Sequence, residues 1–315
     1  MGASILDSLD TLYLMGLTAE FRRAADWAVA NLTFATPRAV ESWDAAVEQH
    51  VSLFETNIRA VGGLLAAGSL SGEAALVARA ADIAARLLPA FDTDSGVPTN
   101  WVQLARGGVR GAQHAILSEF ATLSMEFIST TALTGDPRYA ELAEGALLAA
   151  LRAPGRGSGE ERGFMQTLLD PNGNGGFSGG RISFGGTLTD SFSRAFAFQS
   201  VTCMPAFAAA GAGDSAYEYF IKTWLLMGRD DAFLPYRHLF DAAADSLAAR
   251  LTRRSGTRLY IAEQCVALAM QHAQLPCSRA HAHFFLLVRC RVGAGNVQEQ
   301  MEHLACFMAG TVRPS

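Results

Sequence analysis

Hydrophobic positions along this chain recur at spacings of three and four residues, a period that is typical of helices burying one face. The pattern predicts helical segments at residues 21–32, 53–67, 74–91, 114–133, 139–151, 217–227 and 232–251. Strand signals are scarce, and breaks rich in Gly, Ser, Asp and Pro separate the helices. No fixed-period repeat is visible, so we expect an all-α protein, built as a closed barrel of helix pairs and not as a tandem solenoid.

One predicted helix, within residues 51–65, carries two charges on an otherwise apolar segment. Glu55 and Arg59 stand four residues apart, so a helix places them on the same face. Apolar residues cover almost the whole circumference around them, which predicts a buried helix. A buried glutamate is costly unless it is paired or used in chemistry. The segment alone leaves two interpretations open, a structural ion pair or part of an active site.

Composition sets broad limits on the class of protein. With 315 residues, of which 50% are hydrophobic and 17% charged, the chain can bury a large core in one large domain or two ordinary ones. A net charge of −5 and the lack of any Lys/Arg run argue against nucleic acid as the main partner. No apolar run in the sequence reaches the length of a transmembrane segment. Asn31-Leu-Thr33 is an acceptor sequence for N-glycosylation, which fits a secretory-pathway protein.

Six segments resemble, in the same order, the signatures of glycoside hydrolase family 47, the class I α-1,2-mannosidases. One of them is Phe54-Glu55-Thr56-Asn57-Ile58-Arg59 with the Gly-Gly-Leu-Leu that follows. The others lie at residues 7–17, 91–102, 117–139, 214–224 and 301–307. The resemblance implies an (α/α)7 barrel, incomplete in this chain, with residues 1–315 forming part of one catalytic domain.

The resemblance further implies an inverting α-1,2-mannosidase that trims high-mannose N-linked glycans in the secretory pathway, in the ER or Golgi or as a secreted protein. Inversion needs a carboxylic acid to protonate the departing oxygen and a second carboxylate to activate water on the opposite face of the sugar. The resemblance assigns Glu55 as the acid. Asp214 matches another active-site carboxylate, which we expect to assist protonation or positioning.

Three further residues are expected to hold the glycan. Arg59 resembles the family arginine that binds a mannose ring, and its fork of donors suits paired hydroxyl groups. Glu119 and Glu126 match carboxylates that line the glycan site. They are seven residues apart on one predicted helix, so they would share a face. The alternative is an ordinary exposed helix face.

Three more candidates come with a plain structural alternative. Asn100 and Trp101 would give a hydrogen bond and a stacking surface for a sugar, or form a loop turn with a buried Trp. Asp10 resembles an acidic residue near the family's site. Asp7 and Asp10 would equally cap their helix or pair within it.

The remaining expectations concern the ends of the family pattern and its interruptions. The resemblance implies a catalytic Ca²⁺ ion bound through a threonine, which we expect beyond residue 315. The general base is expected there as well. We therefore expect no metal site in this chain and no activity from it as written. Residues 187–211 and about 265–295 interrupt the pattern, either as translated introns or as genuine surface insertions. The alternative function is a non-catalytic glycan-binding relative, similar to the mannosidase-like proteins of ER-associated degradation.

Overall fold

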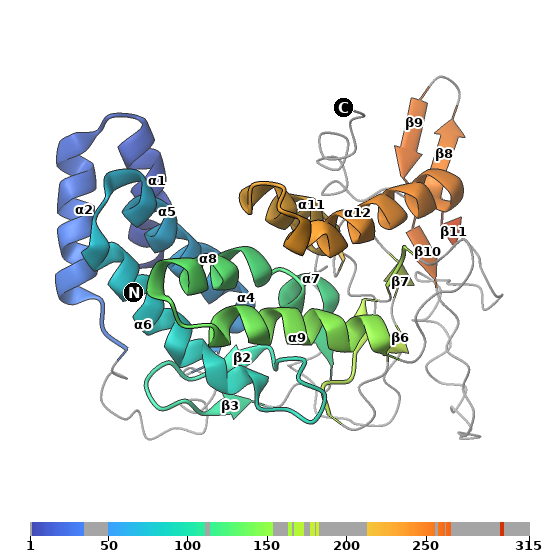
Figure 1. Cartoon of the computed structure of the whole chain (residues 1–315), viewed down its shortest axis with the longest axis horizontal. Helices are drawn as coiled ribbons and strands as arrows, with labels where there is room; N and C mark the ends of the chain where they lie inside the picture. The colour runs from blue at the N-terminus through green and yellow to red at the C-terminus, as the bar shows by residue number, and fades with distance from the viewer. Residues whose placement is uncertain are drawn as a thin grey trace, which may run out of the picture. The chain divides into compact units, whose positions relative to one another are not determined.

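The computed structural model describes residues 2–34, 50–110, 114–153, 163–165, 167–172, 177–179, 181–182, 213–255, 258–261, 263–265 and 297–298. Expectations for residues 187–211, 266–295 and 301–307 therefore lie outside the described residues. The chain divides into two compact units. Unit 1 comprises residues 1–115, 119–152 and 170–175, and unit 2 comprises residues 116–118, 153–169 and 176–315. Figure 1 labels many of their helices and strands.

Unit 1 is mostly helical. Its helices are α1 (Ala3–Leu14), α2 (Thr18–Asn31), α4 (Leu53–Glu55), η1 (Thr56–Val61), α5 (Gly62–Ser71), α6 (Ala74–Leu87), η2 (Leu88–Phe91), α8 (Ser124–Thr134) and α9 (Arg138–Arg152). Its short strands β1 (Val51–Ser52), β2 (Trp101–Val102) and β3 (Val109–Arg110) pair antiparallel in that order. Strands of two residues are too short to show an alternating pattern, which explains why the sequence carries no strand signal here.

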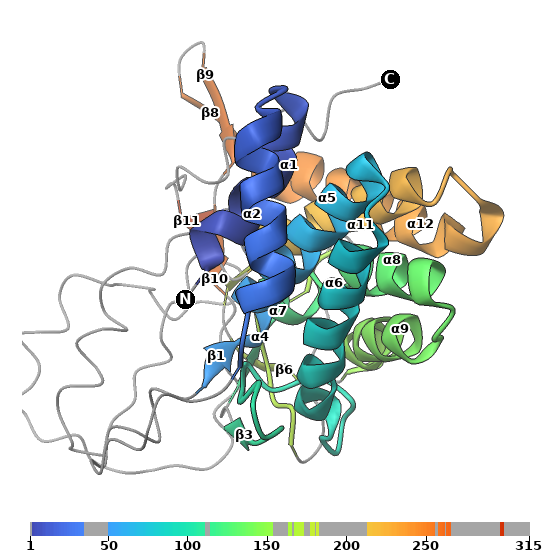
Figure 2. The same ribbon diagram turned by 90° about the vertical axis from the view of Figure 1, so that its left-hand side faces the viewer.

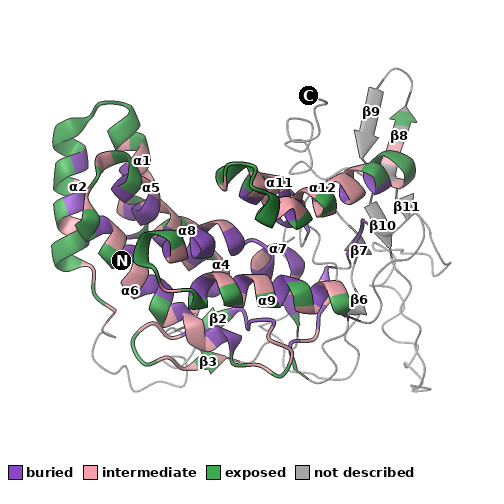
Figure 3. Ribbon diagram, in the orientation of Figure 1, coloured by how far each residue is buried: buried purple, intermediate pink, exposed green. Residues whose placement is uncertain are grey.

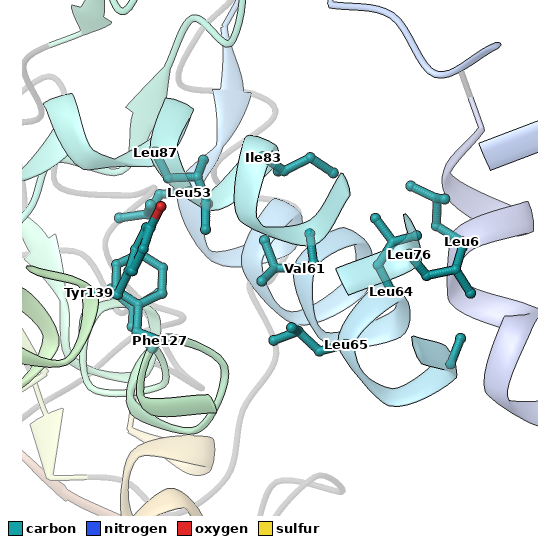
Figure 4. Close-up of a cluster of buried hydrophobic side chains, with 14 of the residues drawn as sticks. Leu6, Leu53, Val61, Leu64, Leu65, Leu76, Ile83, Leu87, Phe127 and Tyr139 are labelled. Carbon is teal, nitrogen blue, oxygen red and sulfur yellow. The ribbon is translucent and has the colours of Figure 1, made fainter. Parts of the chain in front are cut away.

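The core of unit 1 lies between packed helix pairs. Helix α5 packs against both α1 and α6, and α8 packs against α6 and α9. Figures 1 and 2 show α1, α2, α5 and α6 side by side. The buried cluster in Figure 4 joins Leu6 of α1, Val61 of η1 and Leu64 of α5 to Phe127 and Tyr139. The apolar stripes that predict the helices are therefore the surfaces that pack.

The central helix runs without interruption through α4, η1 and α5. Its first turn is capped by Ser52, whose Oγ accepts a hydrogen bond from the Glu55 N–H at 3.2 Å. It ends at Ser71, and the Gly72 that follows has a φ of 75°, the left-handed conformation that glycine tolerates best. Gly63 allows a close approach to α1, because a Cβ there would lie 2.5 Å from the Leu6 carbonyl oxygen. The Gly-Gly pair of the signature thus serves packing.

Unit 2 contains a second helical pair. Its helices are α11 (Asp214–Leu226), η4 (Asp231–Phe233), α12 (Leu234–Ser246) and η5 (Leu247–Leu251). Its strands are β5 (Leu168–Leu169), β6 (Phe177–Gly179), β7 (Arg181–Ile182), β8 (Thr252–Ser255), β9 (Arg258–Ile261), β10 (Glu263–Cys265) and β11 (Val297–Gln298). Helices α11 and α12 pack together, and the Tyr217 hydroxyl accepts a hydrogen bond from the Met165 N–H at 3.1 Å.

The helix predicted at residues 114–133 is not continuous in the structure. Residues 114–133 form strand β4 (Ala115–Ile116), the short helix α7 (Leu117–Phe120) and α8, with a break at residues 121–123. The break is buried, and its Thr122 carbonyl accepts a hydrogen bond from the Asn57 side chain at 3.4 Å. A contact with a helix 65 residues earlier therefore replaces local helical bonding, and apolar spacing alone could not reveal it.

Candidate active site

A charged cluster lies at the start of the central helix of unit 1. Arg59 Nε donates a hydrogen bond to Glu55 Oε2 at 2.5 Å, and Arg59 Nη1 donates to Asp7 Oδ2 at 3.0 Å. The predicted pairing of Glu55 and Arg59 on one helix face is therefore present, and α1 adds a second carboxylate. The hydrogen bond and charge of Glu55, followed by those of Asp7, raise the pKa of the Arg59 guanidinium above its ordinary value.

The expected burial of this cluster is wrong. The Glu55 and Arg59 side chains are 49% and 48% exposed. Leu53, Val61 and Leu64 on the other sides of the same helix are buried. The helix therefore turns one polar edge to solvent, and the charged groups have access to a dissolved substrate. The sequence does not reveal this edge, because apolar residues surround almost the whole helix and only Glu55 and Arg59 interrupt them.

A buried polar layer lies below the charged cluster. The Asn57 side chain is fully buried, and its Nδ2 donates to Glu126 Oε2 at 2.8 Å. Glu126 is itself only 9% exposed, so the alternative of an ordinary exposed helix face is wrong for it. Sequence reasoning did not select Asn57, and it considered Asp7 only as a residue that caps its helix or pairs within it. The available signal was a single amide at residue 57, four residues before the buried Val61 on an apolar face.

The helix geometry here is unusual. Residues 56–61 form a π-helical segment, η1, between α4 and α5. Such π-bulges are rare and occur often at functional sites, since the wider turn changes the direction of side chains. Both Asn57 and Arg59 lie in this segment, one directed inward and the other toward solvent. Gly62 follows, and a Cβ there would lie 3.4 Å from Glu126 Oε1, so the small residue keeps this buried carboxyl uncrowded.

Glu119 is an acid with a strongly perturbed pKa. Burial, and to a smaller extent the negative charge of Glu55, together raise its pKa from 4.5 to about 7. Its Oε2 is buried and has no hydrogen-bond partner among the residues that the structure describes. Glu119 lies in α7 and Glu126 in α8, so the prediction that both share a face of one helix is wrong. The structure still brings Glu119 within electrostatic reach of Glu55.

The predicted sugar contacts at residues 100 and 101 lie on strand β2 and the residue before it. The Asn100 carbonyl accepts a hydrogen bond from the Leu53 N–H at 2.9 Å, which ties this strand to the start of α4. Trp101 pairs with Ser52 across the sheet, and its side chain is exposed. The alternative of a loop turn with a buried Trp is therefore wrong.

The two remaining predicted site residues are Asp10 and Asp214. Asp10 Oδ1 accepts hydrogen bonds from the N–H and hydroxyl of the adjacent Thr11, so its contacts are local. Asp214 begins α11 of unit 2, but its side chain lies outside the described part of the structure. Its part in catalysis stays a prediction.

Within the described residues, no group of three or more His, Cys, Asp or Glu side chains is arranged to hold a metal ion. The same residues contain no helix that is both long and apolar enough to cross a membrane.

The chain was compared with known proteins. The model of glycosyl hydrolase family 47 matches residues 1–314. Mannosyl-oligosaccharide 1,2-alpha-mannosidase IB of Mus musculus is 32% identical over 318 residues, which are 98% of this chain and 38% of that protein. The endoplasmic reticulum mannosyl-oligosaccharide 1,2-alpha-mannosidase of Rattus norvegicus is 26% identical over 317 residues, which are 99% of this chain and 38% of that protein. The chain thus spans well under half the length of these relatives.

A solved structure agrees with these matches. The alpha-1,2-mannosidase from Trichoderma reesei superposes with a TM-score of 0.66 at 27% sequence identity, covering 84% of this chain and 50% of that one. This likeness confirms the predicted mostly helical class and its relation to the (α/α)7 barrel fold.

Proposed function

Because this chain belongs to glycosyl hydrolase family 47, we propose that it forms part of an inverting α-1,2-mannosidase that trims high-mannose N-linked glycans in the secretory pathway. The relatives named above are 1,2-alpha-mannosidases, and one is an endoplasmic reticulum protein. The observation that carries the proposal is the solvent-facing Asp7–Arg59–Glu55 cluster above buried polar groups. Such a cluster offers hydrogen-bond partners for the hydroxyl groups of a sugar and a carboxyl group for proton transfer.

In this proposal Glu55 supplies the proton to the departing oxygen, directly or through water. Its Oε2 is engaged by Arg59, which leaves Oε1 available to a substrate or a water molecule. Arg59 is held from two sides by Glu55 and Asp7, so its remaining N–H donors have a fixed direction. A fixed guanidinium suits adjacent hydroxyl groups of one mannose ring, because less side-chain freedom is lost on binding.

The buried groups serve as the support of the site in this proposal. Asn57 fixes one oxygen of the Glu126 carboxyl group, and Glu126 in turn lies beside Gly62 of the central helix. Glu119 has a pKa of about 7, so at neutral pH about half of it is protonated, which reduces the negative charge that it places beside Glu55. Asp214 is proposed as the second active-site carboxylate. The roles proposed for the described residues are binding, positioning and proton transfer.

The exposed Trp101 fits a role in binding the rest of the glycan. Ser52, Trp101 and Arg110 are directly paired across β1, β2 and β3, so their side chains share one face of the sheet. Ser52 on that face also caps the helix turn that carries Glu55. An exposed indole there offers an apolar surface to a sugar ring beyond the one at Glu55.

The test is mannose release from an α-1,2-linked mannobiose by the full-length protein, followed by NMR of the freshly released anomer. We expect the β-anomer first, and we expect Glu55→Gln to lower kcat strongly with little change in KM, because Gln keeps the size of Glu but delivers no proton. Glu20→Gln on the exposed face of α2 is the matched control. Glycan binding without release by the unmodified protein would instead favour a non-catalytic glycan-binding protein, and the α-anomer would contradict inversion.

A further inference from the structure

The segment that follows α2 has a regular inward and outward alternation. Helix α2 ends at Asn31, and Leu32 continues with an extended backbone, at φ −68° and ψ 110°. Leu32 and Phe34 are partly buried against the core of unit 1, whereas Asn31 and Thr33 are exposed. This is the pattern of an extended chain lying on a surface, in which alternate side chains point to solvent.

The inward side of this segment is fixed to α6. The Arg79 guanidinium donates a hydrogen bond to the Leu32 carbonyl. Arg86 lies over the Phe34 ring, with its guanidinium carbon 4.5 Å from the ring centroid, and Arg79 approaches the same ring at 5.7 Å. Because Leu32 and Phe34 are held in this way, the side chains of Asn31 and Thr33 are held toward solvent.

The outward residues form an acceptor sequence. Asn31-Leu32-Thr33 has the form Asn-x-Ser/Thr with a residue other than Pro in the middle, and no other Asn of this sequence stands two residues before Ser or Thr. Figure 3 shows that α2 is exposed along much of its surface. Its buried positions, Phe21, Ala25 and Ala28, belong to the hydrophobic core of unit 1. A bulky glycan at the end of this helix would therefore extend into solvent.

We propose that Asn31 carries an N-linked glycan in the folded protein. In this reaction a transferase of the secretory pathway joins Asn31 Nδ2 to the anomeric carbon of an oligosaccharide on a lipid diphosphate. The bond between that carbon and the diphosphate oxygen breaks, the lipid diphosphate leaves with the electron pair, and the amide loses one proton to a base. The inference rests on the proposed function for its compartment, because the oligosaccharide donor is met only in the secretory pathway.

The experiment expresses the full-length protein behind a secretion signal in a eukaryotic host. Trypsin releases residues 24–38, which contain Asn31 and no other Asn. A peptide N-glycosidase converts a glycosylated Asn31 to Asp, so mass spectrometry of this peptide gives the occupancy. We expect most of the peptide to be converted, background conversion in Asn31→Gln and Thr33→Ala, and retained conversion in Thr33→Ser, which keeps the hydroxyl group.

A second measurement separates this inference from the proposed function. Asn31 is outside the candidate active site, so Asn31→Gln should release mannose from α-1,2-mannobiose within about twofold of the unmodified protein. Absence of glycan at Asn31 in the secreted, mannose-releasing protein would overturn the inference and leave the function standing. A glycosylated Asn31 in a protein that releases no mannose would support the inference and contradict the function. Conversion that persists in Thr33→Ala would also overturn the assignment.

Discussion

Replacing Glu119 with Gln should make the stability of unit 1 less dependent on pH. In the folded protein, burial and the charge of Glu55 raise the pKa of this carboxyl group from 4.5 to about 7. Below about pH 4.5, the folded and unfolded forms both hold the proton, and the contribution to stability is complete. As pH rises from about 4.5 to 7, the folded form alone keeps the proton, so the free energy of unfolding falls. Above about pH 7 the loss is complete.

The size of this effect follows from how far the pKa rises on folding. A pKa that is higher by one in the folded form corresponds to about 1.36 kcal/mol, so a rise from 4.5 to about 7 is worth about 3 kcal/mol in total. About 2.5 kcal/mol of this lies between pH 5 and pH 8. The Gln side chain brings its own cost of about 1–3 kcal/mol, because its amide donors enter a site where Glu119 Oε2 has no partner. That cost does not change with pH, so the difference between the two pH values isolates the ionisation.

The assay is urea unfolding at about pH 5 and about pH 8, with the unfolding of unit 1 followed for the unmodified protein and for Glu119→Gln. We expect the difference in unfolding free energy between the two pH values to be smaller in the variant by about 2.5 kcal/mol. Glu141→Gln, at an exposed position of α9, is the matched control. In Glu55→Gln the pKa of Glu119 should fall, because the second of the two causes that raise it is removed. An identical pH dependence in Glu119→Gln and the unmodified protein would refute the reasoning.

Three further variants test packing and substrate binding. Gly63→Ala should destabilise the protein by about 1–3 kcal/mol in urea unfolding, because its Cβ would lie 2.5 Å from a backbone oxygen of α1; Gly145→Ala, where no atom lies within 4 Å of the new Cβ, should not destabilise it. Arg59→Ala should raise KM for α-1,2-mannobiose about tenfold and change kcat less, and an unchanged KM would remove the ring-holding role. Trp101→Ala should lower the preference for a high-mannose glycan over mannobiose about fivefold, whereas Val109→Ala, exposed on the opposite face of the sheet, should leave the ratio unchanged.

The helices could be predicted well because their cause is local. Apolar spacing sets the stripe that must be buried, and in segments such as 74–91 and 139–151 the stripe extends over three or more turns. The prediction failed where bonding is not local. The break in residues 121–123 depends on Asn57, and the two-residue strands β1 and β2 exist because the chain on either side holds them together. Neither cause leaves a period in the sequence.

The candidate site shows the same division between local and distant causes. The pairing of Glu55 with Arg59 follows from four-residue spacing alone, so it could be predicted. The contribution of Asp7 could not, because it requires α1 to lie beside the central helix, a contact that depends on the absence of a side chain at Gly63. The exposure of Glu55 also depends on packing, since helices cover the other sides of its helix and leave this one open.

Glu55 and Glu119 have unlike surroundings. The Glu55 carboxyl group is exposed and paired, whereas Glu119 is buried and its Oε2 has no partner among the described residues. Unlike surroundings are what allow neighbouring acids to take different roles in proton transfer. The identity of the two residues could be read from sequence, but the difference between them is a property of the fold.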